Sequence, residues 1–233
     1  MKNILLIPAM GCDARLYADI AQSLSPVINP TVILADKDDL ADCVQQVLQL
    51  APEKFVVLGT SFGGRTALEI AIAAPARVEG LVVIGAGAGV AGDPAAGLRR
   101  AGRLRGAEFE AAVSEMADMV SHLPGPNGPA TRALFIEMAR DNGGGMMARQ
   151  SEALAKRVDL GPRLHEISCP SLLLWGREDK FSPASDGLKM ATAMANARYA
   201  EISECGHFPS LEAPAETAEV LLHWLLDARL ISG

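Results

Sequence analysis

The chain has 233 residues, 49% of them hydrophobic, and carries 21 basic against 28 acidic residues, for a formal net charge of -7. This length allows one sizeable core with at most a small appended subdomain. The acidic balance argues against nucleic acid and anionic membranes as partners, because phosphate binding relies on clustered Lys and Arg. One basic cluster departs from this balance and is interpreted as a solvated helix face; it contains Arg99, Arg100, Arg103 and Arg105.

The cysteine pattern and the N-terminus favour a cytoplasmic protein. No two of Cys12, Cys43, Cys169 and Cys205 have CxxC spacing, so we expect buried free thiols and neither a zinc site nor a disulfide framework. The start, MKNILLIPAMGC, superficially resembles a signal peptide, but its apolar stretch is short and leads directly into a helical pattern. No apolar run approaches the roughly 20 residues that a membrane span needs. We expect no membrane, metal or cofactor.

Short apolar runs alternate with helical patterns over residues 1–89. Strands are predicted at Ile4–Ile7, TVILAD (31–36), KFVVLG (54–59) and GLVVIGAG (80–87), with helices over 12–24, 40–50 and 63–74 between them. Continuous apolar strands separated by helices indicate a parallel sheet that is covered on both faces.

The strand pattern stops between residues 90 and 167. Amphipathic helices are predicted there at 108–123 and 130–141, with breakers at PGPNGP (124–129) and NGGG (142–145). The alternation then resumes with strands at 170–176 and 197–202 and helices at 182–194 and 213–230. The predicted fold class is therefore α/β. A mainly parallel, doubly wound sheet is expected from residues 1–89 and 168–233, with a helical cap insertion at 90–167.

The sequence GTSFG at 59–63 fits the pattern G-x-S-x-G and lies between a predicted strand and helix, as that motif requires. Ser61 should adopt a strained conformation that exposes its hydroxyl, and a side chain at Gly59 or Gly63 would collide with a neighbouring element. The following helix points its N-terminal amides at the site and favours developing negative charge. The alternative is a tight turn whose serine only caps the helix.

A serine hydroxyl is a poor nucleophile unless a base accepts its proton. His207 lies in ECGHFPSLEAP, in a strand-to-helix loop at the carboxyl end of the sheet, where open α/β sheets place their chemistry. It is the predicted base, although a structural hydrogen-bonding role is the alternative. His122 and His165 are interpreted as surface or capping residues, and His223 as a packing residue within a helix.

The base needs an acid that fixes its tautomer. Asp179, in LLLWGREDKFSP, is predicted for this role, with Glu178 and Asp93 as alternatives. The order Ser61, Asp179, His207 is the one that a G-x-S-x-G enzyme of this type shows. The oxyanion hole is expected from the backbone amides of Phe62 and Met10, with Gly11 as the alternative to Met10.

These residues resemble the α/β-hydrolase superfamily over nearly the whole chain. Ser61, Asp179 and His207 match its nucleophile, acid and base, and the insertion matches its cap. The stretches LLIPAMGCDARLY and MARQSEALAKRVDLGPRLHEISCPSLLLWGREDKFSP are similar to a group of small bacterial serine hydrolases. Two features depart from the family. Pro8-Ala9 replaces the frequent His-Gly of the oxyanion loop, and the usual leading hairpin is missing, so about six strands are expected.

The sequence GAGVAG at 87–92 fits the dinucleotide-binding pattern G-x-G-x-x-G. Asp93-Pro94 follows at once, and no strand precedes the insertion, so the βαβ context of such a site is missing. We expect no nicotinamide or flavin here. The glycines are interpreted as letting the chain leave the sheet beside the active site.

The predicted reaction is acyl transfer to water through an acyl-enzyme. The main hypothesis is a carboxylesterase-like serine hydrolase of small, fairly apolar esters or lactones, working as a monomer or homodimer. One alternative is a meta-cleavage-type carbon–carbon hydrolase of a dienoic diketone, which a basic side chain such as Arg149 or Arg65 would favour by binding a substrate carboxylate. The other is a ligand receptor without useful turnover.

The insertion is rich in flexible apolar side chains, which form either an adaptable substrate pocket or the insertion's own core. These residues are Met116, Met119, Phe135, Met138, Met146 and Met147.

Overall fold

The computed structural model describes residues 1–232, and its centre is a single six-stranded sheet. The strands run in the order β2-β1-β3-β4-β5-β6, and every neighbouring pair is parallel. Their bounds are β1 Asn3–Ile7, β2 Asn29–Val32, β3 Phe55–Thr60, β4 Val78–Ile84, β5 Ser171–Gly176 and β6 Ala197–Ile202. The predicted α/β class and strand number are confirmed.

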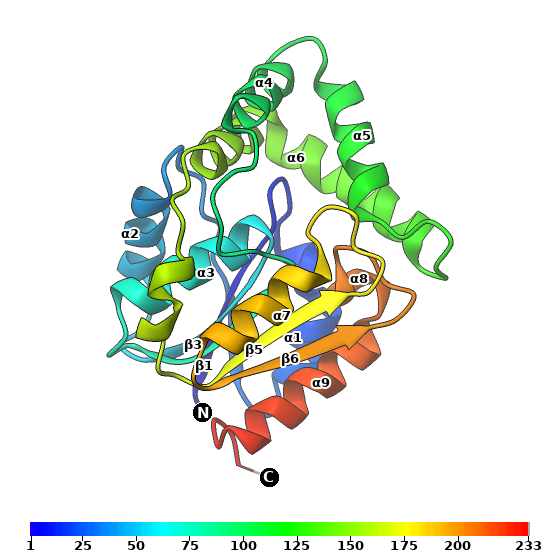
Figure 1. Cartoon of the computed structure of the whole chain (residues 1–233). Coiled ribbons are helices and arrows are strands. Elements are labelled where there is room, and N and C mark those ends of the chain that lie inside the picture. Colours follow the sequence, from blue (N-terminus) through cyan, green and yellow to red (C-terminus); the bar gives the residue numbers. More distant parts are fainter. Residues whose placement is uncertain (233) are drawn as a thin grey trace.

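Helices cover both faces of this sheet, as parallel strands joined by crossovers require. They are α1 Ala18–Leu24, α2 Leu40–Leu50, α3 Phe62–Ala73, α7 Ala184–Ala193, α8 Pro209–Glu212 and α9 Pro214–Asp227, with 3-10 turns η1 Ala14–Tyr17 and η2 Gly161–Glu166. Figure 1 shows α3 and α7 on one face and α1 and α9 on the other. None of the helices in residues 1–232 is long and apolar enough to cross a membrane.

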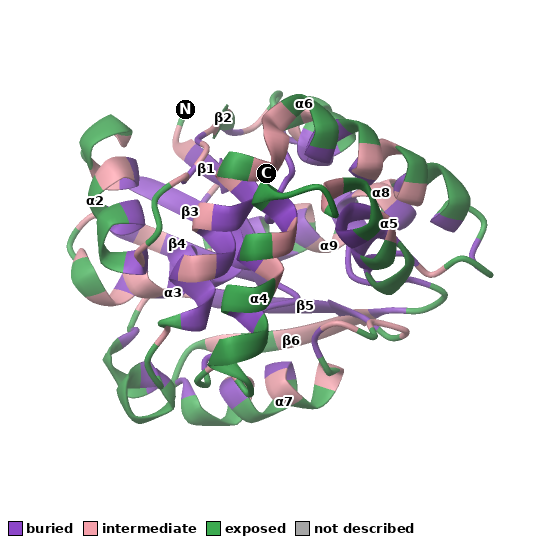
Figure 2. Ribbon diagram, turned by 90° about the horizontal axis from the view of Figure 1, so that it is seen from above, coloured by how far each residue is buried: buried purple, intermediate pink, exposed green. Residues whose placement is uncertain are grey.

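The inner strands are almost entirely buried, whereas the edge strands are not. Every residue of β3 and β5 is buried, while β2 alternates between exposed and half-buried positions. In Figure 2 the inner strands are coloured as buried, whereas the outward faces of the helices are coloured as exposed. β2 also lies earlier than the predicted TVILAD strand, because its register with β1 pairs Asn3 with Asn29 and Leu6 with Val32. Ile33 and Ala35 are buried, but in a loop.

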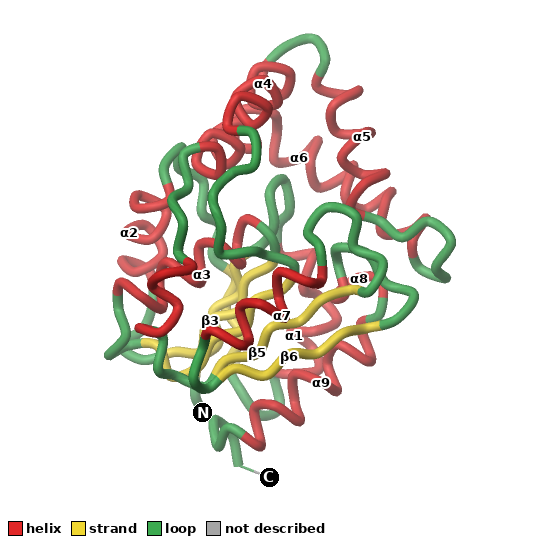
Figure 3. The backbone as a smooth tube through the Cα atoms, viewed as in Figure 1, coloured by secondary structure: helices red, strands yellow, loops and turns green. Residues whose placement is uncertain are grey.

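Three helices stand between β4 and β5 in the chain, at the carboxyl ends of the strands (Figures 1 and 3). They are α4 Pro94–Arg105, α5 Phe109–Val120 and α6 Gly128–Ala155. The predicted break at NGGG is a kink within α6, where Gly143 has φ 78° and ψ 154°, rather than a loop between helices. We refer to residues 90–167 as the cap segment; its division from the rest as a separate unit stays a prediction.

Several flexible apolar side chains of the cap segment pack against the rest of the chain: the Phe135 ring lies 5.9 Å from that of Phe208, and Met147 lies beside Gly11. Phe135, Met138 and Met147 are fully buried, and Met119 is 46% exposed. Met116 and Met119 also line a small cavity between α4 and α5 that is described below.

The turn from β3 into α3 depends on two glycines. A Cβ on Gly63 would lie 1.9 Å from the carbonyl oxygen of Ile7, and one on Gly59 would lie 2.0 Å from that of Gly63. Both neighbours are backbone and cannot move aside, so we expect Gly63→Ala to lower the free energy of unfolding by about 3 kcal/mol. Urea denaturation measures this loss.

Gly102→Ala is the matched control, because Gly102 lies within α4 and a Cβ there would meet nothing within 4 Å. This variant should be more stable than wild type by up to about 1 kcal/mol, since alanine favours a helix over glycine. A Gly63→Ala protein with unchanged stability would contradict the close packing of the turn.

Candidate active site

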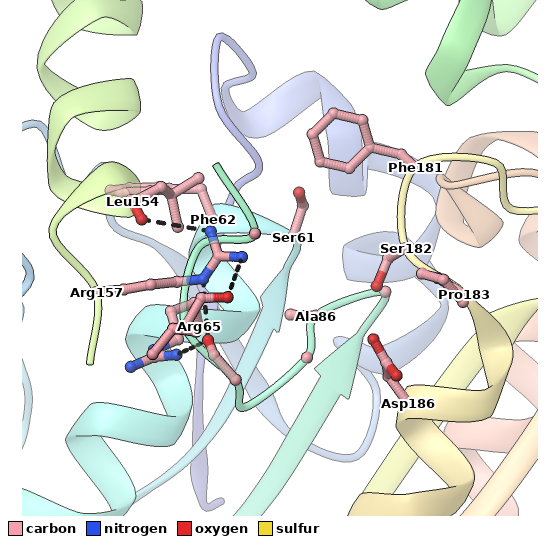
Figure 4. Close-up of a pocket in the computed structure, with 15 residues that line it drawn as sticks. Ser61, Phe62, Arg65, Ala86, Leu154, Arg157, Phe181, Ser182, Pro183 and Asp186 are labelled. Carbon is pink, nitrogen blue, oxygen red and sulfur yellow. Dashed lines mark hydrogen bonds between the residues drawn. The ribbon is translucent and has the colours of Figure 1, made fainter. Parts of the chain in front are cut away.

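Ser61 stands at the sharp turn between β3 and α3 with φ 55° and ψ -113°. Its amide donates to the carbonyl of Ile84 at 2.8 Å, and its carbonyl accepts from the amide of Arg65 at 2.9 Å. A left-handed φ in a non-glycine residue persists only where the surroundings impose it. The predicted conformation is therefore present, and Figure 4 shows the Ser61 side chain between Arg65 and Arg157 on one side and Phe181 on the other.

His207 and Asp179 form a buried pair. His207 Nδ1 lies 2.7 Å from Asp179 Oδ2, and both side chains are almost fully buried. Asp179 Oδ1 accepts from the amides of Phe181 at 2.8 Å and Ser182 at 2.9 Å, which fixes the carboxylate. A carboxylate at Nδ1 holds the proton on that nitrogen and leaves Nε2 as the basic one.

Among the described residues, no hydrogen bond joins the second ring nitrogen of His207 to Ser61. Nε2 is buried and has no hydrogen-bond partner among residues 1–232. Gly85 follows Ile84, the residue that binds the Ser61 amide, and a Cβ on Gly85 would lie 3.0 Å from the imidazole ring. The structure thus brings Ser61 and the His207–Asp179 pair to the same end of β4.

The alternative acids lie elsewhere. Glu178 accepts from the amide of Cys205 at 2.9 Å, and exposed Asp93 pairs with Arg99 at the start of α4. Of the other histidines, His165 and His223 are exposed. The packing role predicted for His223 is wrong, because α9 turns Leu221, Trp224 and Leu225 inward.

The amide of Gly11, the alternative oxyanion-hole donor, already makes a hydrogen bond within the protein. The amide of Gly11 donates to Gln150 Oε1 at 3.0 Å, and Gln150 in turn donates to the carbonyl of Ala35 at 2.8 Å. This leaves the amide of Met10, together with that of Phe62 at the first position of α3, as the proposed donors. Gln150 of α6 was not anticipated, since its position in a helix gives no sign of what it faces.

A cavity of about 290 Å³ opens above Ser61. Its walls come from β4–α4, the end of α6 and the β5–α7 loop; they include Phe62, Gly85, Leu154, Phe181, Ser182 and Asp186. Gly87, Gly89 and Gly92 of the GAGVAG run also line it, as expected for glycines that lead the chain past the site. This volume suits a small molecule.

Arg100 and Arg157 are the unusual arginines of the cap segment. Every other arginine of residues 90–167 pairs with a carboxylate, whereas these two do not. Arg157 donates to the carbonyls of Gly89 at 3.0 Å, Val90 at 3.1 Å and Leu154 at 3.3 Å. Burial lowers the pKa of both guanidinium groups, and for Arg157 the positive charges of Arg65 and Arg100 act in the same direction.

The solvated-face interpretation of the basic cluster is wrong for Arg100. It points toward α6, and its Nε donates to Ser151 Oγ at 2.9 Å. Arg100 also lines the cavity of about 310 Å³ between α4 and α5, which shares Phe181 with the cavity above Ser61.

Arg65 and Arg149, the arginines that the sequence suggested for binding a substrate carboxylate, are hydrogen-bonded to other groups of the protein. Arg65 is buried and donates to Glu69 and to the carbonyls of Ala88, Gly89 and Val158. Arg149 binds the carbonyl of Asp36 at 2.6 Å and its carboxylate at 3.3 Å. The arginine with spare donors beside the cavity is therefore Arg157.

Comparison with known proteins is consistent with this architecture. The chain is 29% identical to a 2-hydroxy-6-oxononadienedioate/2-hydroxy-6-oxononatrienedioate hydrolase of Dechloromonas aromatica, covering 97% of this chain and 87% of that one. It is 32% identical to an enzyme of the same name from Cupriavidus pinatubonensis, over 91% and 82% of the two chains. A solved thermophilic esterase from Thermogutta terrifontis superposes with a TM-score of 0.88 at 21% identity, over 98% and 90%. Residues 8–220 match the family model described as the alpha/beta hydrolase family, and the chain belongs to that family.

Proposed function

We propose that this chain hydrolyses a carbon–carbon bond in an acidic dienoic diketone of the meta-cleavage type, with Ser61, His207 and Asp179 as its catalytic triad. The main support for this substrate class is that Arg157, beside the cavity above Ser61, has no carboxylate partner in residues 1–232. A partly buried charge without a counter-ion is costly, and an anionic ligand would supply one. The names of the curated relatives, which are dioate hydrolases, favour the same substrate class.

In the proposed reaction, Ser61 is the nucleophile, His207 the base and Asp179 the acid. His207 Nε2 takes the proton of Ser61, and the serine oxygen bonds to the ketone carbon while the Met10 and Phe62 amides hold the oxyanion. Collapse breaks the adjacent carbon–carbon bond, and the leaving carbon receives the proton from His207. Water then attacks the acyl-serine, giving a carboxylic acid and free Ser61.

Carbon is a poor leaving group unless its electron pair is delocalised. A conjugated keto acid accepts that pair, and a guanidinium bound to its carboxylate orients it and stabilises the added charge. An arginine beside the cavity would therefore act in both binding and bond cleavage. Arg100, in the neighbouring cavity, would accommodate a second anionic end of a longer di-acid.

The direct experiment compares two substrate classes on the same protein. We expect loss of the 2-hydroxy-6-oxononadienedioate chromophore at a kcat/KM well above that for p-nitrophenyl acetate or hexanoate. Fast ester hydrolysis without dienedioate turnover would support the ester-hydrolase hypothesis instead. Binding of dienedioate without turnover of either class would indicate a receptor.

Removing the charge of Arg157 should affect acidic substrates selectively. We expect Arg157→Gln to raise KM for the dienedioate by about 10- to 100-fold, because a charge-assisted hydrogen bond to the substrate is lost. KM for a neutral ester should change little. Arg157→Lys keeps the charge but not the guanidinium geometry and should lie between the two. Steady-state kinetics on both substrates measure the effect.

Arg163→Gln is the matched control, because Arg163 is an exposed arginine of the same segment that pairs with Glu166. It should leave both KM values at their wild-type levels. Equal KM changes on acidic and neutral substrates for Arg157→Gln would indicate damage to the loop that Arg157 holds, and would count against an anionic substrate.

A further inference from the structure

Glu212 is a buried carboxylate that the proposed mechanism does not use. It ends the short helix α8, five residues after His207, and is only 4% exposed. Its Oε2 accepts from the amides of Gly206 at 3.0 Å and His122 at 2.8 Å, and its Oε1 accepts from that of Phe208 at 3.3 Å. The carboxylate therefore binds the backbone on both sides of His207 and, at the same time, a residue of the cap segment.

The remaining amides of this loop are also bonded. His207 donates its amide to the carbonyl of Val120 at 2.9 Å, and Cys205 donates to Glu178 at 2.9 Å. The four successive amides of residues 205–208 thus have three acceptor groups. Because His207 lies in a loop rather than in a helix or strand, these bonds fix the backbone from which its ring reaches Asp179.

The cap segment meets the loop backbone to backbone. Val120 is the last residue of α5 and His122 follows two residues later; Figure 1 shows α8 beneath that end of the helix. A Cβ on Gly206 would lie 2.7 Å from the His122 amide nitrogen and 3.1 Å from the Val120 carbonyl. Asn127, at the start of α6, adds a bond from Nδ2 to the Glu212 carbonyl at 2.9 Å.

A carboxylate suits this position better than a neutral amide. Burial raises the pKa of Glu212, while the three amide donors lower it. Both oxygens of an ionised carboxyl group accept hydrogen bonds, whereas a glutamine has one acceptor and would turn donors toward one of these amides. A glutamine there would keep only part of the arrangement.

We infer that Glu212 is a positioning residue, which holds the His207 loop against cap residues 120–122 and makes the alignment of the imidazole depend on the seating of the cap segment. This inference rests on the proposed role of His207 as the base for Ser61. It does not depend on which bond the enzyme cleaves.

The test uses a small alkyl fluorophosphonate, which needs the serine and its base but not the natural substrate. The Ser61 oxygen bonds to phosphorus, His207 takes the serine proton, and the phosphorus–fluorine bond breaks as fluoride leaves. We expect Glu212→Ala to lower the maximal labelling rate by about 100-fold, the cost of a base displaced by roughly 1 Å, with half-saturation unchanged. Glu212→Gln should lie between Glu212→Ala and wild type.

Two further variants complete the design. Glu216→Gln, at an exposed glutamate one turn further on in α9, should label at the wild-type rate. Gly206→Ala should act like Glu212→Gln, because its Cβ pushes the cap backbone away from the loop. Proton NMR of the His207 Nδ1–H resonance should shift in both affected variants and stay unchanged in Glu216→Gln.

The outcomes separate this inference from the proposed function. The positioning role of Glu212 would be overturned if folded Glu212→Gln and Gly206→Ala proteins had wild-type labelling rates and a wild-type His207 Nδ1–H resonance. This holds even if their melting temperatures fall. These two variants also decide the matter if Glu212→Ala does not fold. A wild-type protein that labels at Ser61 but cleaves no dienedioate refutes the proposed substrate alone. A wild-type protein that does not label removes the base role and this inference with it.

Discussion

Replacing Ser61 with alanine is expected to lower kcat by about 10⁴-fold or more, because no other group can form the acyl intermediate. The variant should fold normally, since alanine meets the same backbone demand at φ 55° and the Ser61 amide bond to Ile84 does not involve the side chain. Steady-state turnover of the dienedioate, with circular dichroism to verify folding, measures the loss.

Ser182→Ala is the matched control for this prediction. Ser182 lines the same cavity, and its recorded contacts to Asp179 and Trp175 use only its backbone. It should keep kcat close to the wild-type value. Comparable turnover in Ser61→Ala and wild type would exclude Ser61 as the nucleophile and leave it a residue of a tight turn, whose side chain makes no capping hydrogen bond to α3.

Asp179→Asn should lower kcat by about 10³- to 10⁴-fold by fixing the wrong tautomer of His207. The amides of Phe181 and Ser182 keep an acceptor at the Oδ1 position, so the new amide group faces His207 and donates to Nδ1. The ring then carries its proton on Nε2 and cannot accept the serine proton. Rapid-quench measurement of acyl-enzyme formation tests this directly.

Asp186→Asn provides the comparison, because Asp186 lies at the same cavity and pairs only with Lys189 at 3.4 Å. Its kcat should stay close to wild type. If Asp179→Asn instead left acylation intact and Glu178→Gln abolished it, the acid would be Glu178. Its carboxylate would then have to leave the Cys205 amide and bind His207 during catalysis.

The sequence predicted the architecture well because local patterns of apolar residues indicate where the strands and helices lie. Apolar runs such as those of β3 and β5 indicate buried parallel strands, and α2 at 40–50 and β6 at 197–202 have the predicted bounds. The break at 142–145 was located correctly but is a kink, because the helices on its two sides follow each other directly through Gly143. The edge strand β2 was misplaced, since its limits are set by pairing with β1.

The site followed from the sequence only where motif and loop position coincide. Ser61, Asp179 and His207 each follow a predicted strand, and parallel strands end at one edge of the sheet. Choosing Asp179 over its neighbour Glu178 needed the structure, because both lie in one loop and only the fold directs one toward His207 and the other toward the Cys205 amide.

What the sequence by itself determined is the α/β-hydrolase architecture and the positions of the proposed nucleophile Ser61 and base His207, because hydrophobic period, glycine spacing and loop position are local properties of the chain. Only the tertiary structure decided which charges have counter-ions. It separated Arg100 and Arg157 from the paired arginines of the cap segment, and it placed Glu212 on the amides beside His207. Such pairings join residues far apart in the sequence, and whether a charge is desolvated depends on packing that no local pattern records.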